Sequence, residues 1–177
     1  CIPWDGGIDE PLSEEGWQIL APSSLPYLPH SQPPIEMSTD DMHSVRKQFI
    51  SATINANDAG FDMIEVHLAH GYLLSSFISP FTNQRQDDYG GNVENRMRFP
   101  LEVVSAVRAI WPADKPISVR ISATDWVEGG LSEAEMLKVA AMLKQAHVDI
   151  INVSTGQVIK EEEPIYGRMF QVPFADQ

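Results

Sequence analysis

The sequence predicts an α/β fold in which parallel βα units follow one another along the chain. Three nearly continuous apolar runs, at residues 61–66, 117–121 and 150–153, alternate with segments of helical periodicity. Such runs are typical of parallel strands that helices cover. The spacing of the second and third runs fits an ordinary βα repeat, whereas an insertion at residues 73–92 follows the first run. This pattern alone fits either a barrel or a doubly wound sheet.

A first helix is expected ahead of the first strand. It begins near Ser38, where Thr39 or Asp40 can cap it, and it ends at Gly60. Its apolar face is formed by Met42, Val45, Phe49 and Ala56.

Two further helices are expected between the strands. One covers residues 93–110, and Pro100 should kink it because proline removes a backbone hydrogen bond. The other begins at a capping box made by Ser132 and Glu135.

The composition excludes some classes of protein. The chain has 177 residues, of which 43% are hydrophobic, and its formal charge of −13 repels nucleic acid. It has one cysteine, so it can form no internal disulfide, and no apolar run approaches the roughly 20 residues that cross a bilayer. We expect neither nucleic-acid nor membrane partners, and a reducing, cytoplasmic setting.

Two histidines and a tyrosine follow the first apolar run directly. His67, His70 and Tyr72 are therefore expected at the carboxyl end of a strand, where barrels and open sheets place their sites. Two imidazole N–H groups side by side can donate to one oxygen and stabilise negative charge on it. A tyrosine, which is protonated at neutral pH, can act as an acid. Half of a metal site, or a purely structural histidine pair, are the alternatives.

Arg120 interrupts the second apolar run. A charged side chain in a buried strand is costly unless it is paired. It is therefore a candidate for holding a ligand, and a structural salt bridge to Asp125 or Asp149 is the alternative.

The stretch from Phe61 to Phe99 contains H-x-x-H-G-Y-L and then S-P-x-x-N-x-R-x-D-x-Y-G-G. It resembles the old yellow enzyme family, FMN-dependent NAD(P)H oxidoreductases built on a TIM barrel. No G-x-G-x-x-G follows a predicted strand, which also disfavours a dinucleotide-binding sheet. The resemblance implies a fragment of a TIM (β/α)8 barrel with about three βα units. It also implies FMN as cofactor and NADPH or NADH as reductant.

The resemblance assigns roles to the candidate residues. It implies that His67 and His70 bind the carbonyl oxygen of an α,β-unsaturated substrate, and that Tyr72 binds beside them and delivers a proton to the α-carbon. Arg120 matches the arginine that contacts the pyrimidine edge of the flavin. The insertion is expected to be mostly scaffolding, with an ion pair between Arg85 and Asp87.

Residues 1–37, rich in proline and glycine, are expected to be a loop, and residues 38–177 the central part of an incomplete FMN-binding barrel. Trp4, Trp17 and Tyr27 give the loop apolar material that can pack on the barrel or contact a substrate directly. We interpret the chain as part of a longer protein that can form a homo-oligomer. Alone, it should bind FMN weakly or not at all and be inactive.

Three alternatives to an ene-reductase remain. One is the reductase-like half of a bifunctional aromatic acyl-CoA monooxygenase of the salicylyl-CoA hydroxylase type, which the chain also resembles at residues 2–7 and 98–101. The second is a metal-dependent hydrolase on a TIM barrel. The third is an inactive binding or structural fragment.

Overall fold

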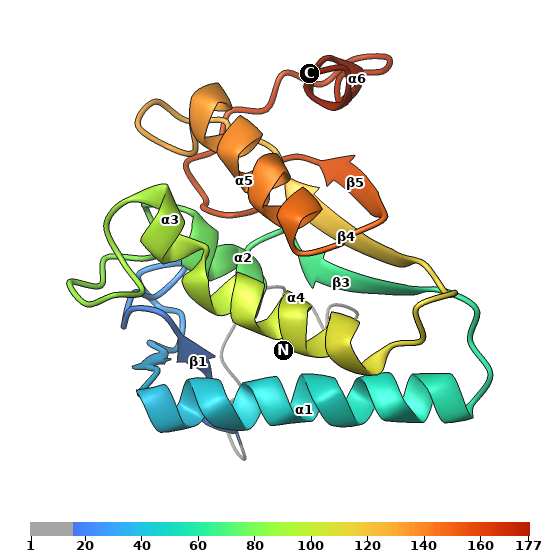
Figure 1. Ribbon diagram of the computed structural model, residues 1–177. Helices are drawn as coiled ribbons and strands as arrows, with labels where there is room; N and C mark the ends of the chain where they lie inside the picture. Colours follow the sequence, from blue (N-terminus) through green and yellow to red (C-terminus); the bar gives the residue numbers. More distant parts are fainter. Residues whose placement is uncertain (1–15) are drawn as a thin grey trace.

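The computed structural model describes residues 16–177 and contains a parallel sheet with helices on one side (Figure 1). Two short strands, β1 (Leu20–Ala21) and β2 (Ile35–Glu36), pair in parallel within the N-terminal loop. The remaining elements in chain order are α1 (Thr39–Asp58), β3 (Ile64–Leu68), α2 (Leu73–Ile78), α3 (Val93–Arg96), α4 (Arg98–Ile110), β4 (Ile117–Ser122), α5 (Glu133–Gln145), β5 (Ile150–Ser154) and α6 (Val172–Ala175).

The main sheet has the strand order β3-β4-β5, and both strand pairs are parallel. The predicted parallel βα units are therefore confirmed. The strands expected at 117–121 and 150–153 are present, and each continues for one more residue. In Figure 1, α4 and α5 lie on the same side of this sheet, and α1 runs beside α4.

The predicted boundaries of the first strand were wrong. Phe61 and Met63 lie before β3, with exposed fractions of 59% and 47%. The reason is the end of α1, where Gly60 has a φ of +83° and the Phe61 N–H donates to Ala56 O at 3.1 Å. Phe61 therefore belongs to the C-terminal cap of the helix, and the strand starts only at Ile64.

The start of α1 also differs from the prediction. The cap is Ser38, not Thr39 or Asp40, because Ser38 forms a capping box with Asp41. The Asp41 N–H donates to Ser38 Oγ at 3.2 Å, and the Ser38 N–H donates to Asp41 Oδ2 at 2.9 Å. Two N–H groups of the first turn are satisfied in this way.

The irregularity predicted in the helix over residues 93–110 is confirmed, but it is a division at Met97 and not a kink at Pro100. The segment 93–110 forms two helices, α3 and α4, that meet at Met97. Pro100 lies in the first turn of α4, where its missing N–H costs little. The capping box of α5 is also confirmed, since Ser132 Oγ accepts from the Glu135 N–H and the Glu135 side chain accepts from the Ser132 N–H.

The strands are not apolar on both faces. On one face, Val66, Leu68, Val119 and Ile121 are buried in the same hydrophobic core as residues of α4 and α5. On the other face the strands carry Glu65, His67, Ser118, Arg120, Ser122, Asn152 and Ser154. In a parallel barrel, the face away from the helices is the interior. The helices therefore cover one face and leave a polar face for a site.

The insertion after β3 holds the N-terminal loop through Arg85. The predicted ion pair with Asp87 is confirmed, at 3.0 and 3.2 Å from Arg85 Nε to the two carboxylate oxygens. The same guanidinium donates to Pro22 O at 3.1 Å and to Met37 O at 2.7 Å. Residues 16–37 thus pack against the insertion, whereas Trp4 and residues 2–7 lie outside the described residues.

Within residues 16–177, no helix combines the length and the apolar character needed to cross a membrane.

We predict that Arg85→Ala lowers the free energy of unfolding by at least about 2 kcal/mol, because two buried carbonyl oxygens lose a charged donor. Urea unfolding of the two proteins would measure the difference. Lys138→Ala is the matched control, since Lys138 pairs with Glu94 on the exposed surface and its loss should change stability little. Equal effects of the two substitutions would contradict the structural role of Arg85.

Candidate functional site

A row of polar side chains crosses the polar face of the sheet. The strand register aligns His67 of β3 with Arg120 of β4, and Arg120 with Asn152 of β5. The sequence placed His67 after the strand, and this was wrong because β3 continues to Leu68, beyond the predicted end at residue 66. The row joins His67 and Arg120, which lie more than fifty residues apart in the chain.

The two histidines and the tyrosine form a ring cluster, as their spacing suggested. The centroid of the His67 ring lies 5.2 Å from that of His70 and 5.2 Å from that of Tyr72. Tyr72 is the N-terminal cap residue of α2 and is 64% exposed. His67 therefore lies between a partly buried histidine and a phenol that solvent or a ligand can reach.

The backbone after β3 is bent so that His70 turns back toward the sheet. His70 has a φ of +61°, and its N–H donates to Ser122 Oγ at 3.0 Å. Gly71 follows with a φ of +69°, and a Cβ there would lie 2.6 Å from Gln157 O. Only glycine fits this close approach. The bend ties the end of β3 to β4 and to the loop after β5.

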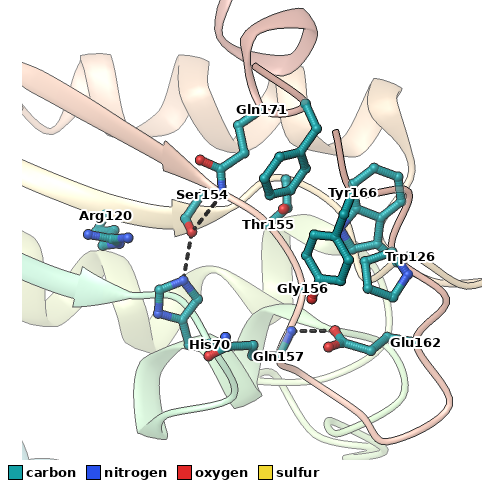
Figure 2. A pocket seen from close by; sticks show the side chains of 12 residues that line it. His70, Arg120, Trp126, Ser154, Thr155, Gly156, Gln157, Glu162, Tyr166 and Gln171 are labelled. Atoms are coloured by element: carbon teal, nitrogen blue, oxygen red, sulfur yellow. Dashed lines mark hydrogen bonds between the residues drawn. The ribbon is translucent and has the colours of Figure 1, made fainter. Parts of the chain in front are cut away.

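The His70 ring is held by Ser154, the last residue of β5, which is in turn contacted by Gln171 (Figure 2). His70 Nε2 lies 2.7 Å from Ser154 Oγ, and Gln171 Nε2 donates to the same oxygen at 3.4 Å. If Ser154 donates its proton to Nε2, the His70 N–H is on Nδ1 and remains available to a ligand. The sequence did not predict this contact, which gives one nitrogen of His70 a partner within the protein.

The charges around the histidines favour their neutral forms. Burial and then the positive charge of Arg120 lower the pKa of His67, against the opposing charge of Glu65. Burial, Arg120 and the neighbouring His67 lower the pKa of His70. Both rings are therefore neutral at pH 7, and each offers one N–H donor.

Glu65 completes the polar face below the histidines. Burial acts to raise its pKa, but hydrogen bonds from Asn152 and Ser118 and the charge of Arg120 lower it overall. Ser118 Oγ donates to Glu65 Oε2 at 2.7 Å, and Asn152 Nδ2 donates to it at 3.0 Å. The carboxylate is thus held ionised by the strands themselves.

Arg120 does not form the salt bridge that was considered as its alternative role. Asp125 accepts from Ser79 Oγ and the Leu131 N–H, and Asp149 accepts from Arg108 and the Ile117 N–H. Among residues 16–177, the buried Arg120 Nε has no hydrogen-bond partner. A buried cationic donor without an acceptor fits the electron-rich oxygen or nitrogen edge of a bound cofactor such as FMN.

A cavity of about 240 Å³ opens beside these groups. Six of the residues that line it are His70, Arg120, Trp126, Ser154, Tyr166 and Gln171. The sequence left Ser154 without a role and did not single out Trp126 or Gln171. Of these three residues, only Ser154 could have been found from the sequence. It stands at the end of an apolar run, and His67 and Arg120 stand near the ends of the other two runs.

No three His, Cys, Asp or Glu side chains within the described part of the chain are placed to hold a metal ion.

We predict that Arg120→Gln raises the pKa of both His67 and His70, because a neighbouring positive charge that opposes their protonation is removed. Titration of the imidazole Cε1 proton resonances would measure both values. Arg98→Gln is the control, since Arg98 is exposed on α4 and donates to Asp88 O and Asn95. Unchanged histidine pKa values in Arg120→Gln would contradict the coupling.

Comparison with known proteins gives one consistent result. Residues 12–177 match the model of the NADH:flavin oxidoreductase / NADH oxidase family. The chain is 46% identical over 158 residues to an NADPH dehydrogenase of Bacillus pumilus, and 43% identical over 164 residues to one of Geobacillus sp.. These alignments cover 89% and 93% of this chain but only 46% and 47% of the relatives, so the chain spans about half of their length.

Solved structures give the same answer for the fold. A 2-naphthoyl-CoA reductase in complex with 2-naphthoyl-CoA superposes with a TM-score of 0.77 at 28% identity, over 92% of this chain and 25% of the other. Morphinone reductase superposes with a TM-score of 0.71 at 27% identity, over 92% of this chain and 48% of the other. The predicted TIM-barrel fragment is confirmed, and the chain belongs to the NADH:flavin oxidoreductase / NADH oxidase family, the family of the old yellow enzymes.

Proposed function

We propose that the full-length protein is an FMN-dependent NAD(P)H oxidoreductase that reduces the activated C=C bond of α,β-unsaturated carbonyl compounds. Membership of the family implies FMN as the cofactor and a reduced nicotinamide as the reductant. The observation that carries the proposal is the ring cluster of His67, His70 and Tyr72, next to the unpaired donor of Arg120.

Arg120 and the polar face would hold the cofactor. FMN, when bound and reduced, supplies the hydride that the β-carbon of the alkene receives. Arg120 would donate from Nε to an electron-rich atom of the cofactor, and its charge would stabilise negative charge there. One such charge-assisted hydrogen bond contributes about 1.5–3 kcal/mol.

His67 and His70 would bind the carbonyl oxygen of the substrate. Both rings favour the neutral form, and when Ser154 donates to His70 Nε2 each ring has one N–H for a ligand, so together they can donate two hydrogen bonds to one oxygen. Negative charge grows on that oxygen as the β-carbon accepts a hydride, and the donors stabilise it. Ser154 would keep the His70 ring in the required orientation through its contact with Nε2.

Tyr72 would supply the proton. Its phenol lies beside His67 and is exposed, so a substrate held by the histidines can come within its reach. Transfer of the phenolic proton to the α-carbon balances the hydride received at the β-carbon and completes a two-electron reduction of the double bond. Tyr72 would recover its proton from solvent.

One alternative has an observation in its favour. The similarity to a reductase solved with 2-naphthoyl-CoA supports the reductase-like half of an enzyme that acts on aromatic acyl-CoA esters. Residues 2–7, which carry part of that resemblance, lie outside the described residues. The presence of a flavin monooxygenase domain in the full-length protein would favour this alternative.

We predict that Tyr72→Phe in the full-length protein slows alkene reduction by about 10²- to 10⁴-fold, because the general acid is lost. Flavin reduction by NADPH should be unchanged, since it requires no proton from Tyr72. Stopped-flow absorbance of the flavin measures the two half-reactions separately. Equal slowing of both would rule out the role as proton donor.

We also predict that His67→Ala or His70→Ala weakens binding of a phenol by about tenfold or more, because each removes a hydrogen bond to the charged phenolate oxygen. Titration of the visible flavin spectrum gives the dissociation constants. His43→Ala is the control, since His43 is exposed on α1 and contacts Arg46. Phenol affinity that survives in both site variants would refute the proposed donors.

A further inference from the structure

A second and larger hollow lies beside the candidate site. It has a volume of about 1070 Å³, and Gly71, Tyr72 and Leu73 form part of its wall. Tyr72 therefore borders both this hollow and the ring cluster. We call it the loop groove, because residues of the segment 16–34 form much of its wall, opposite residues 158–161.

The walls of the loop groove are apolar and partly exposed. Trp17, Leu25 and Tyr27 line it with exposed fractions of 76%, 40% and 46%. Exposed large apolar side chains that gather around a hollow are typical of a binding groove. A ligand that covers this apolar surface would therefore bind more tightly.

The loop that forms one wall is held in place by several hydrogen bonds. Ser24 Oγ donates to Pro34 O at 2.7 Å, and the Gln84 N–H donates to Ser23 Oγ at 2.9 Å. The Ile35 N–H donates to Ile19 O at 2.9 Å. These contacts, with those of Arg85, fix the wall before a ligand arrives, which lowers the entropic cost of binding.

The charges of the loop groove disfavour an anionic ligand. Among the described residues that line it, Lys160 is the only lysine or arginine, and it pairs with Glu161 at 3.6 Å. Glu128 is a further acidic residue of the wall. An acyl-CoA ester carries several phosphate charges, and these would meet two carboxylates and one already paired ammonium group.

We propose that the loop groove binds the body of the substrate, and that this body is a neutral, extended apolar group such as an aryl substituent. The inference rests on the proposed function, which places the reacting alkene at His67, His70 and Tyr72. It goes further in two respects. It assigns the loop groove as the site that determines specificity, and it selects neutral aryl enones over aromatic acyl-CoA esters.

The test uses phenols as unreactive probes of the full-length holoenzyme. Dissociation constants of phenol, 3-phenylphenol, 4-phenylphenol and 4′-hydroxybiphenyl-4-carboxylate are measured from the visible flavin spectrum. At least one phenylphenol should bind about tenfold or more tightly than phenol, because the groove covers its second ring. The carboxylate should bind less tightly than 4-phenylphenol.

Two variants locate the effect. Leu25→Ser should weaken binding of the phenylphenol, which reduces its advantage in affinity over phenol. The same substitution should leave the affinity for phenol unchanged. Ile35→Ser is the matched control, since Ile35 is 49% exposed on the same segment but does not line the groove, and it should preserve the advantage.

Each remaining outcome overturns a stated part of the proposal. Phenylphenols no tighter than phenol would show that the groove does not take the substrate body, as would an advantage that Leu25→Ser leaves intact. A carboxylate that binds as tightly as 4-phenylphenol would overturn the selection for neutral groups. If phenol itself does not perturb the flavin spectrum, the proposed function fails and this inference with it, which separates the two failures.

Discussion

Successive side chains of a strand point to opposite faces of the sheet, and this alternation is the constraint on which the structure depends. Alternate residues of β3, β4 and β5 enter the hydrophobic core beneath α4 and α5. The residues between them must point to the other face, where His67, Arg120 and Asn152 are aligned by the parallel register. Burial of the apolar face thus fixes the position of the polar row, and the site needs no separate scaffold.

Within that row, Arg120 sets the electrostatics. Burial is the largest cause of the lowered pKa of both histidines, the charge of Arg120 is the next, and the same charge helps to lower the pKa of Glu65. Strand neighbours satisfy the Glu65 carboxylate, but no described residue accepts from Arg120 Nε. A buried donor left in this state is a cost to the folded protein that a bound acceptor can offset. The same residue therefore combines an unsatisfied donor, which suits a bound acceptor, with an effect on the pKa of the two histidines.

The insertion after β3 connects the site to the N-terminal loop. Arg85 holds Pro22 and Met37 by their carbonyl oxygens, so a segment distant in sequence becomes one wall of the loop groove. Tyr72 borders both the ring cluster and that groove. In the function that we propose, the chemistry takes place at the end of a strand and a loop recognises the rest of the substrate, a division common in barrels.

The sequence by itself determined features that depend on neighbouring residues: the α5 capping box and the β4 and β5 strands. It also marked His67, His70, Tyr72 and Arg120 as candidate site residues, because their residue types and the family motif are local. Tertiary structure decided that His67 lies inside β3, that Ser154 and Gln171 hold His70, and that Asp125 and Asp149 have partners other than Arg120. Those contacts join residues up to 84 positions apart, and local patterns carry no information about such pairs.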